Sequence, residues 1–123
     1  MDACLVKQKR IIEAIEKNYW VSPTGTIFSW LRRGGGRVKM PSPLKPRDVF
    51  GYDQVALYDR FKEPPVQARV HIVVWLQFHG PYSKELEINH IDRNKKNNNL
   101  KNLELVTASE NVQHRFRTGS WKQ

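Results

Sequence analysis

The sequence predicts an α+β fold, and three observations carry that prediction. An amphipathic run near the N-terminus has the spacing of a helix. Several short runs of aromatic and β-branched residues, separated by Pro and Gly turns, indicate strands. The last third of the chain carries strand, loop, strand and helix signals in that order. With 123 residues, 39% of them hydrophobic, the chain has the size of one ordinary domain with a modest core.

The N-terminal part is expected to begin with a helix and a hairpin. Residues 5–18 place apolar side chains such as Ile11 and Ile15 at helical spacing, with Lys and Glu between them. Residues 19–21 and 26–30 are aromatic and β-branched and flank a Pro/Gly turn. This pattern predicts two antiparallel strands.

Residues 31–48 differ in composition from the rest of the chain. They contain three consecutive glycines, three prolines and a single acid. The segment is interpreted as an extended, mobile loop or arm that lies along a phosphate backbone, with a solvated linker as the alternative. The large local excess of positive charge favours the arm. Its six basic residues are Arg32, Arg33, Arg37, Lys39, Lys45 and Arg47.

The middle of the chain predicts a second pair of strands. Residues 51–59 and 66–70 have strand-like composition, and residues 61–65 form the turn between them. Residues 71–78 are apolar on all sides, so periodicity leaves open whether they form a buried helix or a buried strand. Gly80 and Pro81 end that run.

The last third predicts a compact unit of two strands and a helix. Residues 86–91 alternate like a strand, residues 92–99 form a polar loop, and residues 103–106 are a second short strand. Thr107 is a good N-cap for a helix that runs to about Thr118.

The charge of the chain points to a polyanionic partner. There are 21 Lys and Arg residues against 12 Asp and Glu, which gives a formal net charge of +9. Basic side chains displace counterions from phosphates, so nucleic acid is the favoured partner. A basic surface that only maintains solubility is the alternative.

A single cysteine and the absence of a long apolar run indicate a soluble, cytoplasmic protein. Cys4 alone builds neither a disulfide within the chain nor a cysteine-based zinc finger. The longest apolar stretch, residues 72–76, is far too short to cross a bilayer. The N-terminus lacks the apolar run of a signal peptide, so no membrane partner is expected.

The polar residues of the last third suit phosphodiester hydrolysis. That reaction needs a base for water and a metal ion that stabilises charge on the phosphate and the leaving oxygen. His90, at the end of a predicted strand, is a suitable base near neutral pH. Asn89 and Asn111 can offer amide oxygens to one ion if the helix packs across the strands. Asn102 can tie the loop back through hydrogen bonds.

Residues 88–111, with these side chains at this spacing, resemble the HNH endonucleases. The likeness is greatest to the branch common among phage and intron-encoded homing enzymes. It implies a small ββα-metal nuclease unit, preceded here by an N-terminal helix and short β-hairpins. It further implies that His90 is the general base, that Asn102 is structural, and that Asn111 and Asn89 hold the metal ion.

One position departs from that family pattern. Asn89 stands where many relatives have aspartate, so one negative charge is missing. The ion is then expected to depend more on the DNA phosphate, or on Asp92 acting through water. Mg²⁺ is the expected ion, with Mn²⁺ or another divalent ion as alternatives.

Two further stretches extend the resemblance. Residues 70–74 resemble the segment before the nuclease motif, and residues 19–29 resemble a modular segment that is thought to contribute to DNA binding. The chain is therefore divided into residues 1–50, a DNA-binding helix, hairpin and basic arm, and residues 51–123, the HNH nuclease domain. The side chains expected to contact double-stranded DNA are Arg32, Arg33, Arg37, Lys39, Lys95, Lys96, His114, Arg115 and Arg117.

Several residues receive a structural interpretation instead. Asparagine tolerates left-handed backbone and bonds locally, so Asn94, Asn97, Asn98 and Asn99 are expected to be turn residues. His71, on an apolar segment, is expected to be a satisfied core residue.

Three hypotheses for function follow. The first is a metal-dependent DNA endonuclease, nicking or double-strand cleaving, of the phage homing type, in the host bacterial cytoplasm if phage-encoded. The second is an inactive DNA-binding module that keeps the HNH fold, which the asparagine at position 89 supports. The third, a basic RNA-binding or protein-interaction domain, leaves the spacing of His90 and Asn111 unexplained. A monomer and a homodimer both remain open.

Overall fold

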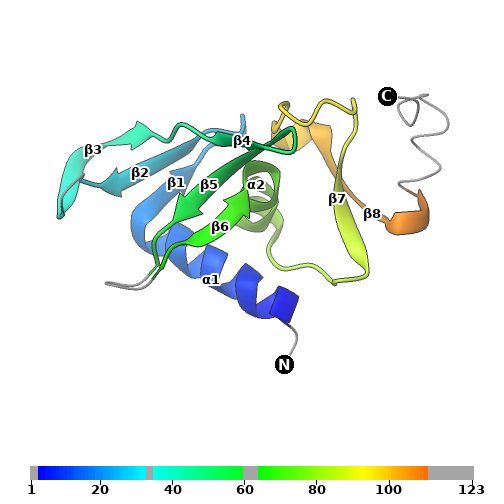
Figure 1. Ribbon diagram of the computed structural model, residues 1–123, viewed down its shortest axis with the longest axis horizontal. Helices are drawn as coiled ribbons and strands as arrows, with labels where there is room; N and C mark the ends of the chain where they lie inside the picture. The colour runs from blue at the N-terminus through cyan, green and yellow to red at the C-terminus, as the bar shows by residue number, and fades with distance from the viewer. Residues whose placement is uncertain (1–2, 33–34, 60–63, 111–123) are drawn as a thin grey trace.

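The computed structural model describes residues 3–32, 35–59 and 64–110, and it has the mixed α+β architecture that the sequence predicts (Figure 1). Within these ranges the strands form antiparallel sheets of order β1-β2-β3, β4-β5-β6 and β7-β8. The elements in chain order are α1 (Ala3–Asn18), β1 (Tyr19–Val21), β2 (Ile27–Leu31), β3 (Arg37–Pro43), β4 (Arg47–Val49), β5 (Tyr52–Leu57), β6 (Val66–Arg69), α2 (Val70–His79), β7 (Leu86–His90), the 3-10 helix η1 (Leu100–Asn102) and β8 (Leu103–Thr107).

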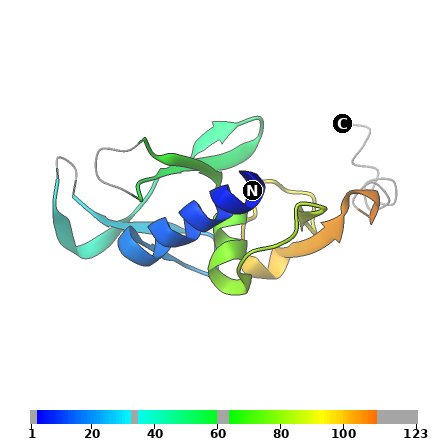
Figure 2. The same cartoon turned by 90° about the horizontal axis from the view of Figure 1, so that it is seen from below.

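The elements are arranged around α2. Figure 1 shows the two three-stranded sheets side by side with α1 beneath them, and the β7-β8 pair on the other side of α2. Seen from below, α1 crosses in front of the sheets, while β7 and β8 extend away from them (Figure 2). The helix α2 therefore connects the sheet-bearing part of the molecule to the strand pair that carries His90.

One hydrophobic core joins both halves of the chain. It buries side chains from α1, from β1 and β2, from β5 and β6, from α2 and from the start of β8. On α1 the buried residues Ile11, Ala14 and Ile15 follow helical spacing, as predicted. Residues before and after position 50 contribute to this one core. The predicted domain boundary at residue 50 stays a prediction.

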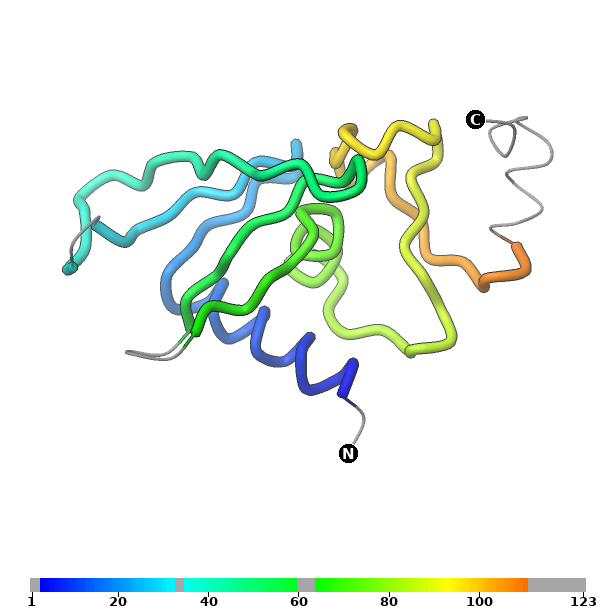
Figure 3. Tube along the Cα trace, in the orientation of Figure 1, coloured from blue at the N-terminus to red at the C-terminus, as the bar shows by residue number. Residues whose placement is uncertain are grey.

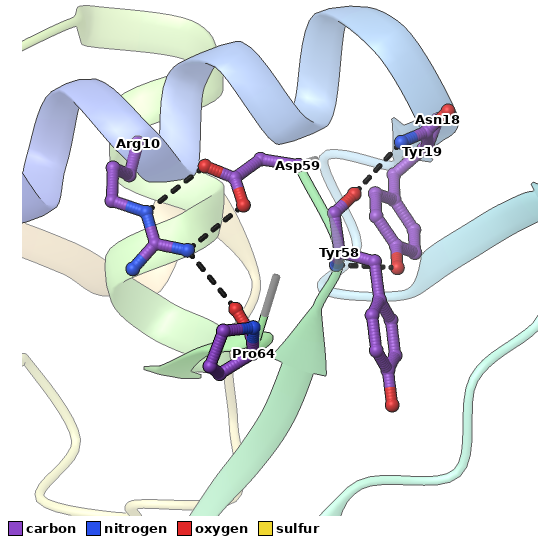
Figure 4. Close-up of polar contacts among 6 residues, drawn as sticks. All are labelled: Arg10, Asn18, Tyr19, Tyr58, Asp59 and Pro64. Atoms are coloured by element: carbon purple, nitrogen blue, oxygen red, sulfur yellow. Dashed lines mark hydrogen bonds and ion pairs between the residues drawn. The ribbon is translucent and has the colours of Figure 1, made fainter. Parts of the chain in front are cut away.

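A buried ion pair ties α1 to the end of β5 (Figure 4). The guanidinium of Arg10 donates to both carboxylate oxygens of Asp59, at 2.9 and 2.8 Å, and to the carbonyl of Pro64 at 3.1 Å. At the other end of α1, Asn18 donates to the carbonyl of Tyr58 at 2.7 Å. Bidentate geometry of this kind fixes orientation as well as distance.

The prediction of a loop over residues 31–48 is wrong where the structure describes strands, at residues 37–43 and 47–48, whereas the expected contact with a phosphate backbone stays a prediction. Residues 37–43 form β3, which pairs with β2 through Ser29↔Ser42 and Phe28↔Pro43. β3 is the edge strand of its sheet. Edge strands tolerate prolines and carry charges that discourage further pairing, so the composition that suggests a loop also suits an edge.

The ambiguous apolar run is a helix. α2 spans ten residues and packs against α1, β5, β6 and β7, so its side chains are buried or half-buried except for the last three residues, 77–79, which are exposed. Gly80 ends it with a positive φ of 80° and donates its backbone N–H to the carbonyl of Leu76 at 3.1 Å. Within the described residues, no helix has the length and apolar character needed to cross a membrane.

The strand–loop–strand order of the last third is confirmed. β7 and β8 pair from Leu86↔Thr107 to His90↔Leu103. The Thr107 hydroxyl accepts the backbone N–H of Glu110 at 3.1 Å, which confirms the predicted cap, and residues 108–110 are helical. The predicted remainder of that helix and residues 61–63 of the predicted turn lie outside the described residues.

Candidate functional site

His90, the last residue of β7, lies in a buried pocket of aromatic rings. Its exposed fraction is 5%, and its ring centroid lies 4.7 Å from that of His71 and 6.2 Å from that of Tyr52. His71 and Tyr52 themselves stack at 5.5 Å. Tyr52 begins β5 and His71 lies in the first turn of α2. Three separate elements thus meet at His90, and the prediction that His71 is a core residue is confirmed by its 5% exposure.

Burial and positive neighbours keep both imidazoles neutral. Desolvation lowers the pKa of His90 below its usual 6.5, although the hydrogen bond that His90 donates to Asn98 and the charge of Asp92 act against this shift. Burial, aided by the charges of His90 and Arg69, lowers the pKa of His71 to about 3. An uncharged imidazole at neutral pH is the form that can accept a proton.

Asn98 determines which nitrogen of His90 carries the proton. Its side-chain oxygen Oδ1 lies 2.9 Å from His90 Nε2. A carbonyl oxygen only accepts hydrogen bonds, so Nε2 must be the protonated nitrogen and Nδ1 the free base. Asn98 is 5% exposed. The prediction that Asn98 is merely a turn residue is therefore wrong.

The N-terminal hairpin holds the loop that carries Asn98. A side chain at Gly25 would meet the backbone oxygen of Asn98 at 2.8 Å, and Gly25 has a positive φ of 97°. Next to it, the backbone N–H of Leu100 donates to the carbonyl of Pro23 at 2.8 Å. The glycine at this turn thus permits a close approach that a side chain would prevent.

Asn89 points away from His90, as expected for neighbouring residues on a strand. Its amide N–H₂ donates to Glu104 Oε1 at 2.8 Å, across the β7-β8 register, and Arg93 donates to its oxygen Oδ1. Asn89 is 3% exposed. An amide oxygen and a carboxylate thus lie together on this face of the strand pair, with a guanidinium cation on the amide.

Asn102 closes the loop between the two strands. Its amide nitrogen donates to Asp92 Oδ1 and to the carbonyl of Asn97, both at 2.9 Å, and its Oδ1 accepts the backbone N–H of Asp92 at 3.1 Å. Its carbonyl accepts the backbone N–H of Ile91 at 2.8 Å. These contacts hold both ends of the loop within one hydrogen-bonded network.

Adjacent lysines in this loop have different environments. Lys95 places Nζ 4.6 Å from the centroid of the Tyr52 ring, whose other neighbour is the Arg69 guanidinium at 4.0 Å. Lys96 instead bridges Asp48 and Asp53, at 2.9 and 2.7 Å. Its charge is balanced locally, so a phosphate contact is supported better for Lys95 than for Lys96.

The remaining predicted DNA-binding side chains divide into two groups. Arg32, Arg37 and Lys39 are exposed around β2 and β3, and Arg37 donates to the carbonyl of Lys17 and to Asn18 at 3.0 and 3.1 Å. The predicted residues that lie outside the described residues are Arg33, Asn111, His114, Arg115 and Arg117.

The structure adds residues to the site that sequence reasoning misses. Tyr52, Arg69 and Asn98 reach His90 or its aromatic neighbour from three different segments. No local sequence pattern identifies Tyr52 or Arg69 as site residues, because only the pairing and packing of the strands bring them close to His90. For Asn98 a signal exists, since it is one of several asparagines in the loop after the candidate base.

A strand that ends in a buried histidine, a loop held by asparagines and a second strand that leads into a helix form the arrangement that the resemblance to HNH nucleases predicts. Residues 68–113 match the family model of the HNH endonucleases. This match confirms the predicted resemblance to the HNH endonucleases over these residues.

Similar proteins agree with this assignment. The SPbeta prophage-derived YosQ of Bacillus subtilis (strain 168), named as an HNH homing endonuclease, is 34% identical over 87% of this chain and 57% of its own length. The uncharacterized HNH endonuclease L247 of Acanthamoeba polyphaga mimivirus is 36% identical over 84% of this chain and 24% of its own length.

A solved structure matches as well. The HNH homing endonuclease I-HmuI, described for DNA binding and cleavage, superposes with a TM-score of 0.67 and 30% identity over 84% of this chain and 54% of that chain. The chain thus spans little more than half the length of YosQ and I-HmuI.

Proposed function

We propose that this chain acts as a metal-dependent endonuclease that hydrolyses phosphodiester bonds in double-stranded DNA. The observation that carries the proposal is the neutral, buried His90, whose Nε2 is bonded to Asn98 Oδ1 so that Nδ1 is the basic nitrogen. The names of YosQ and I-HmuI both contain the words HNH homing endonuclease, and that of YosQ is prophage-derived, which supports a phage homing-type role. Such a role would be carried out in the cytoplasm of a bacterial host.

In this mechanism His90 Nδ1 accepts a proton from water as the water oxygen attacks phosphorus. The bond from phosphorus to the leaving deoxyribose oxygen breaks, and that oxygen takes a proton from a solvent water and ends as a hydroxyl. His90 afterwards releases its proton to solvent, which restores the neutral base. Asn98 keeps the imidazole in the required tautomer, while Asn102 holds the loop in place. Exposed cations, among them Lys95, Arg37 and Lys39, bind phosphates on either side.

The side-chain oxygens on the Asn89 face of the strand pair suit a hard divalent cation. Within the described residues, no cluster of three or more His, Cys, Asp and Glu side chains is suited to hold an ion. The amide nitrogen of Asn89 donates to the Glu104 carboxylate, and its amide oxygen already accepts a hydrogen bond from Arg93. We assign Asn89, Asn111 and the DNA phosphate as ligands, with Glu104 supplying the charge that an aspartate at position 89 would bring. Mg²⁺ or Mn²⁺ bound there would stabilise charge on the phosphate and leaving oxygen.

A second candidate is a DNA-binding module that does not cut. The contact of Arg93 with Asn89 Oδ1 favours it, because the guanidinium takes the atom that a metal ion needs. If Asn89 is a metal ligand, the Arg93→Ala variant, which lacks this contact, should bind the metal ion more tightly than the wild type.

A plasmid assay tests the two candidates. Supercoiled plasmid is incubated with the protein in Mg²⁺, Mn²⁺ or EDTA, and again with the His90→Ala variant. The nuclease predicts metal-dependent nicking or linearisation that falls by about 10²–10⁴-fold in His90→Ala, which is the usual contribution of a general base. Equal binding by both proteins with no cutting in any metal would favour the binding module.

A further inference from the structure

The turn between β4 and β5 presents an exposed aromatic ring in an unfavourable backbone conformation. Phe50 has a φ of +55° and is followed by Gly51 with a φ of +86°. Val49 and Tyr52 pair on either side, so this is a two-residue turn with positive φ at both positions. Such turns favour Asn-Gly, and a bulky residue at the first position is strained. Phe50 is nevertheless 86% exposed, the highest fraction among the large hydrophobic side chains that the structure describes.

The turn is braced against the loop that follows His90. Asp48 accepts the backbone N–H of Gly51 at 3.0 Å, and Lys96 bridges Asp48 and Asp53 at 2.9 and 2.7 Å. The side chain of Lys95 lies 3.4 Å from the position that a Cβ on Gly51 would take. Figure 3 shows the green turn beside the yellow loop. The strained turn is thus held in a fixed place beside the loop.

The turn lies close to His90, the proposed general base. Tyr52, two residues after Phe50, has its ring 6.2 Å from that of His90. The surroundings are basic, because Lys45 and Arg47 are exposed before the turn and Lys95 lies across from it. An exposed apolar ring on a turn with basic side chains in the neighbouring segments suits a polyanion with an apolar interior, which is the character of stacked base pairs beneath a phosphate backbone.

We infer that Phe50 inserts its ring between adjacent base pairs of the bound duplex, within a few steps of the phosphodiester that faces His90. The inference rests on the proposed function, because it takes duplex DNA as the partner. Apolar side chains that enter the minor groove in this way unstack one base step, unwind the helix and bend it. Insertion by Phe50 opens the groove beside His90 and fixes which phosphate is presented to the base.

A linking-number assay tests this without knowledge of the target sequence. Relaxed closed plasmid is saturated with protein in EDTA, treated with a topoisomerase that needs no metal, stripped of protein and resolved by gel. Wild-type protein is expected to shift the topoisomer distribution through unwinding. Phe50→Asn should give an about twofold or greater reduction in that shift, whereas Phe50→Leu, which can still insert, should retain most of it.

The choice of asparagine separates insertion from folding. Asn suits the first position of this turn, so Phe50→Asn should melt at the same temperature as wild type or higher. Phe78→Gln is the matched control, since Phe78 is another exposed aromatic, at 40%, on a different element, and its loss should leave unwinding unchanged.

The outcomes distinguish this inference from the proposed catalysis. Unwinding that depends on Phe50, in a protein that cuts in no metal, supports insertion and rejects the nuclease. Metal-dependent cutting with equal unwinding by wild type and Phe50→Asn overturns insertion alone. A change in self-association only, seen by size-exclusion chromatography, or no plasmid binding at all, also overturns insertion.

Discussion

Two clusters in this molecule bury an ionisable side chain, and they compensate its loss of hydration in different ways. At the Arg10–Asp59 cluster a carboxylate that is 4% exposed is matched by a guanidinium at 2.8 and 2.9 Å (Figure 4). At the His90–Asn98 cluster an imidazole that is 5% exposed is bonded to a neutral amide at 2.9 Å. The first cluster balances charge with charge, and the second avoids charge altogether.

This difference suggests that the first cluster serves the stability of the fold and the second serves the proposed reaction. A bidentate ion pair fixes α1 against the end of β5 through two charge-assisted hydrogen bonds. A neutral imidazole held by an amide keeps one basic nitrogen, which is what proton transfer requires. Changes at the first cluster should therefore affect folding, and changes at the second should affect DNA cleavage.

The largest effect is expected from Asp59→Ala. Removing the carboxylate leaves the Arg10 guanidinium without its countercharge, which costs about 3–5 kcal/mol for buried pairs. The lower end applies here, because the Arg10 side chain is 33% exposed and keeps some hydration. Urea unfolding should measure this loss. Cleavage per folded molecule at low temperature should stay near wild type, and a large fall there would contradict the division between the clusters.

Asn98→Ala should act in the opposite way. Without its acceptor oxygen the tautomer and orientation of His90 are no longer fixed, so cleavage should fall by about a hundredfold with a smaller loss of stability. Single-turnover rates at saturating protein measure this. Asn98→Asp keeps the acceptor and adds a negative charge that raises the pKa of His90. The acid limb of its pH–rate profile should therefore move to higher pH, a shift that a purely structural asparagine would not produce.

Acid should destabilise the histidine cluster. The pKa of His71 is about 3 in the folded protein against 6.5 in the unfolded chain. Between these values the unfolded state binds the proton more tightly, so the free energy of unfolding falls as the pH drops below 6.5. At pH 5 the loss should be about 2 kcal/mol.

Urea unfolding at pH 7 and pH 5 measures this loss. His71→Phe should remove most of the difference, leaving the smaller contribution of His90, whose pKa is also lowered. An undiminished difference in His71→Phe would locate the acid sensitivity elsewhere.

Much of the fold follows from local patterns. The helix over α1, the hairpin of β1 and β2, and the Thr107 cap are predictable because spacing, turn residues and capping chemistry all act within a few residues. The strand β3 is not predictable in this way, because its prolines and charges suit a loop as well as an edge strand. It forms a strand because it pairs with the available edge of β2, which lies outside its own sequence.

The site is predictable only in part for the same reason. Asn89 and His90 lie together in the sequence, and their divergent directions follow from strand geometry. The rings of Tyr52 and His71 reach His90 through the packing of β5 and α2, which no spacing encodes. The paired environment of Lys96, bound to two carboxylates distant in sequence, is hidden in the same way.

The smallest effect on DNA binding is expected from the two adjacent lysines. One of them is paired with carboxylates and the other is not, so they show on the surface a contrast like that between the two buried clusters. Lys96 is balanced by Asp48 and Asp53, whereas Lys95 lies over the Tyr52 ring. Lys95→Gln should therefore reduce the dependence of DNA binding on salt by about one counterion, and Lys96→Gln should leave it unchanged. Fluorescence anisotropy of a labelled duplex in EDTA, over a series of NaCl concentrations, measures both slopes. Equal slopes for the two variants would mean that DNA displaces Lys96 from its carboxylates, and the surface contrast would then not hold in the complex.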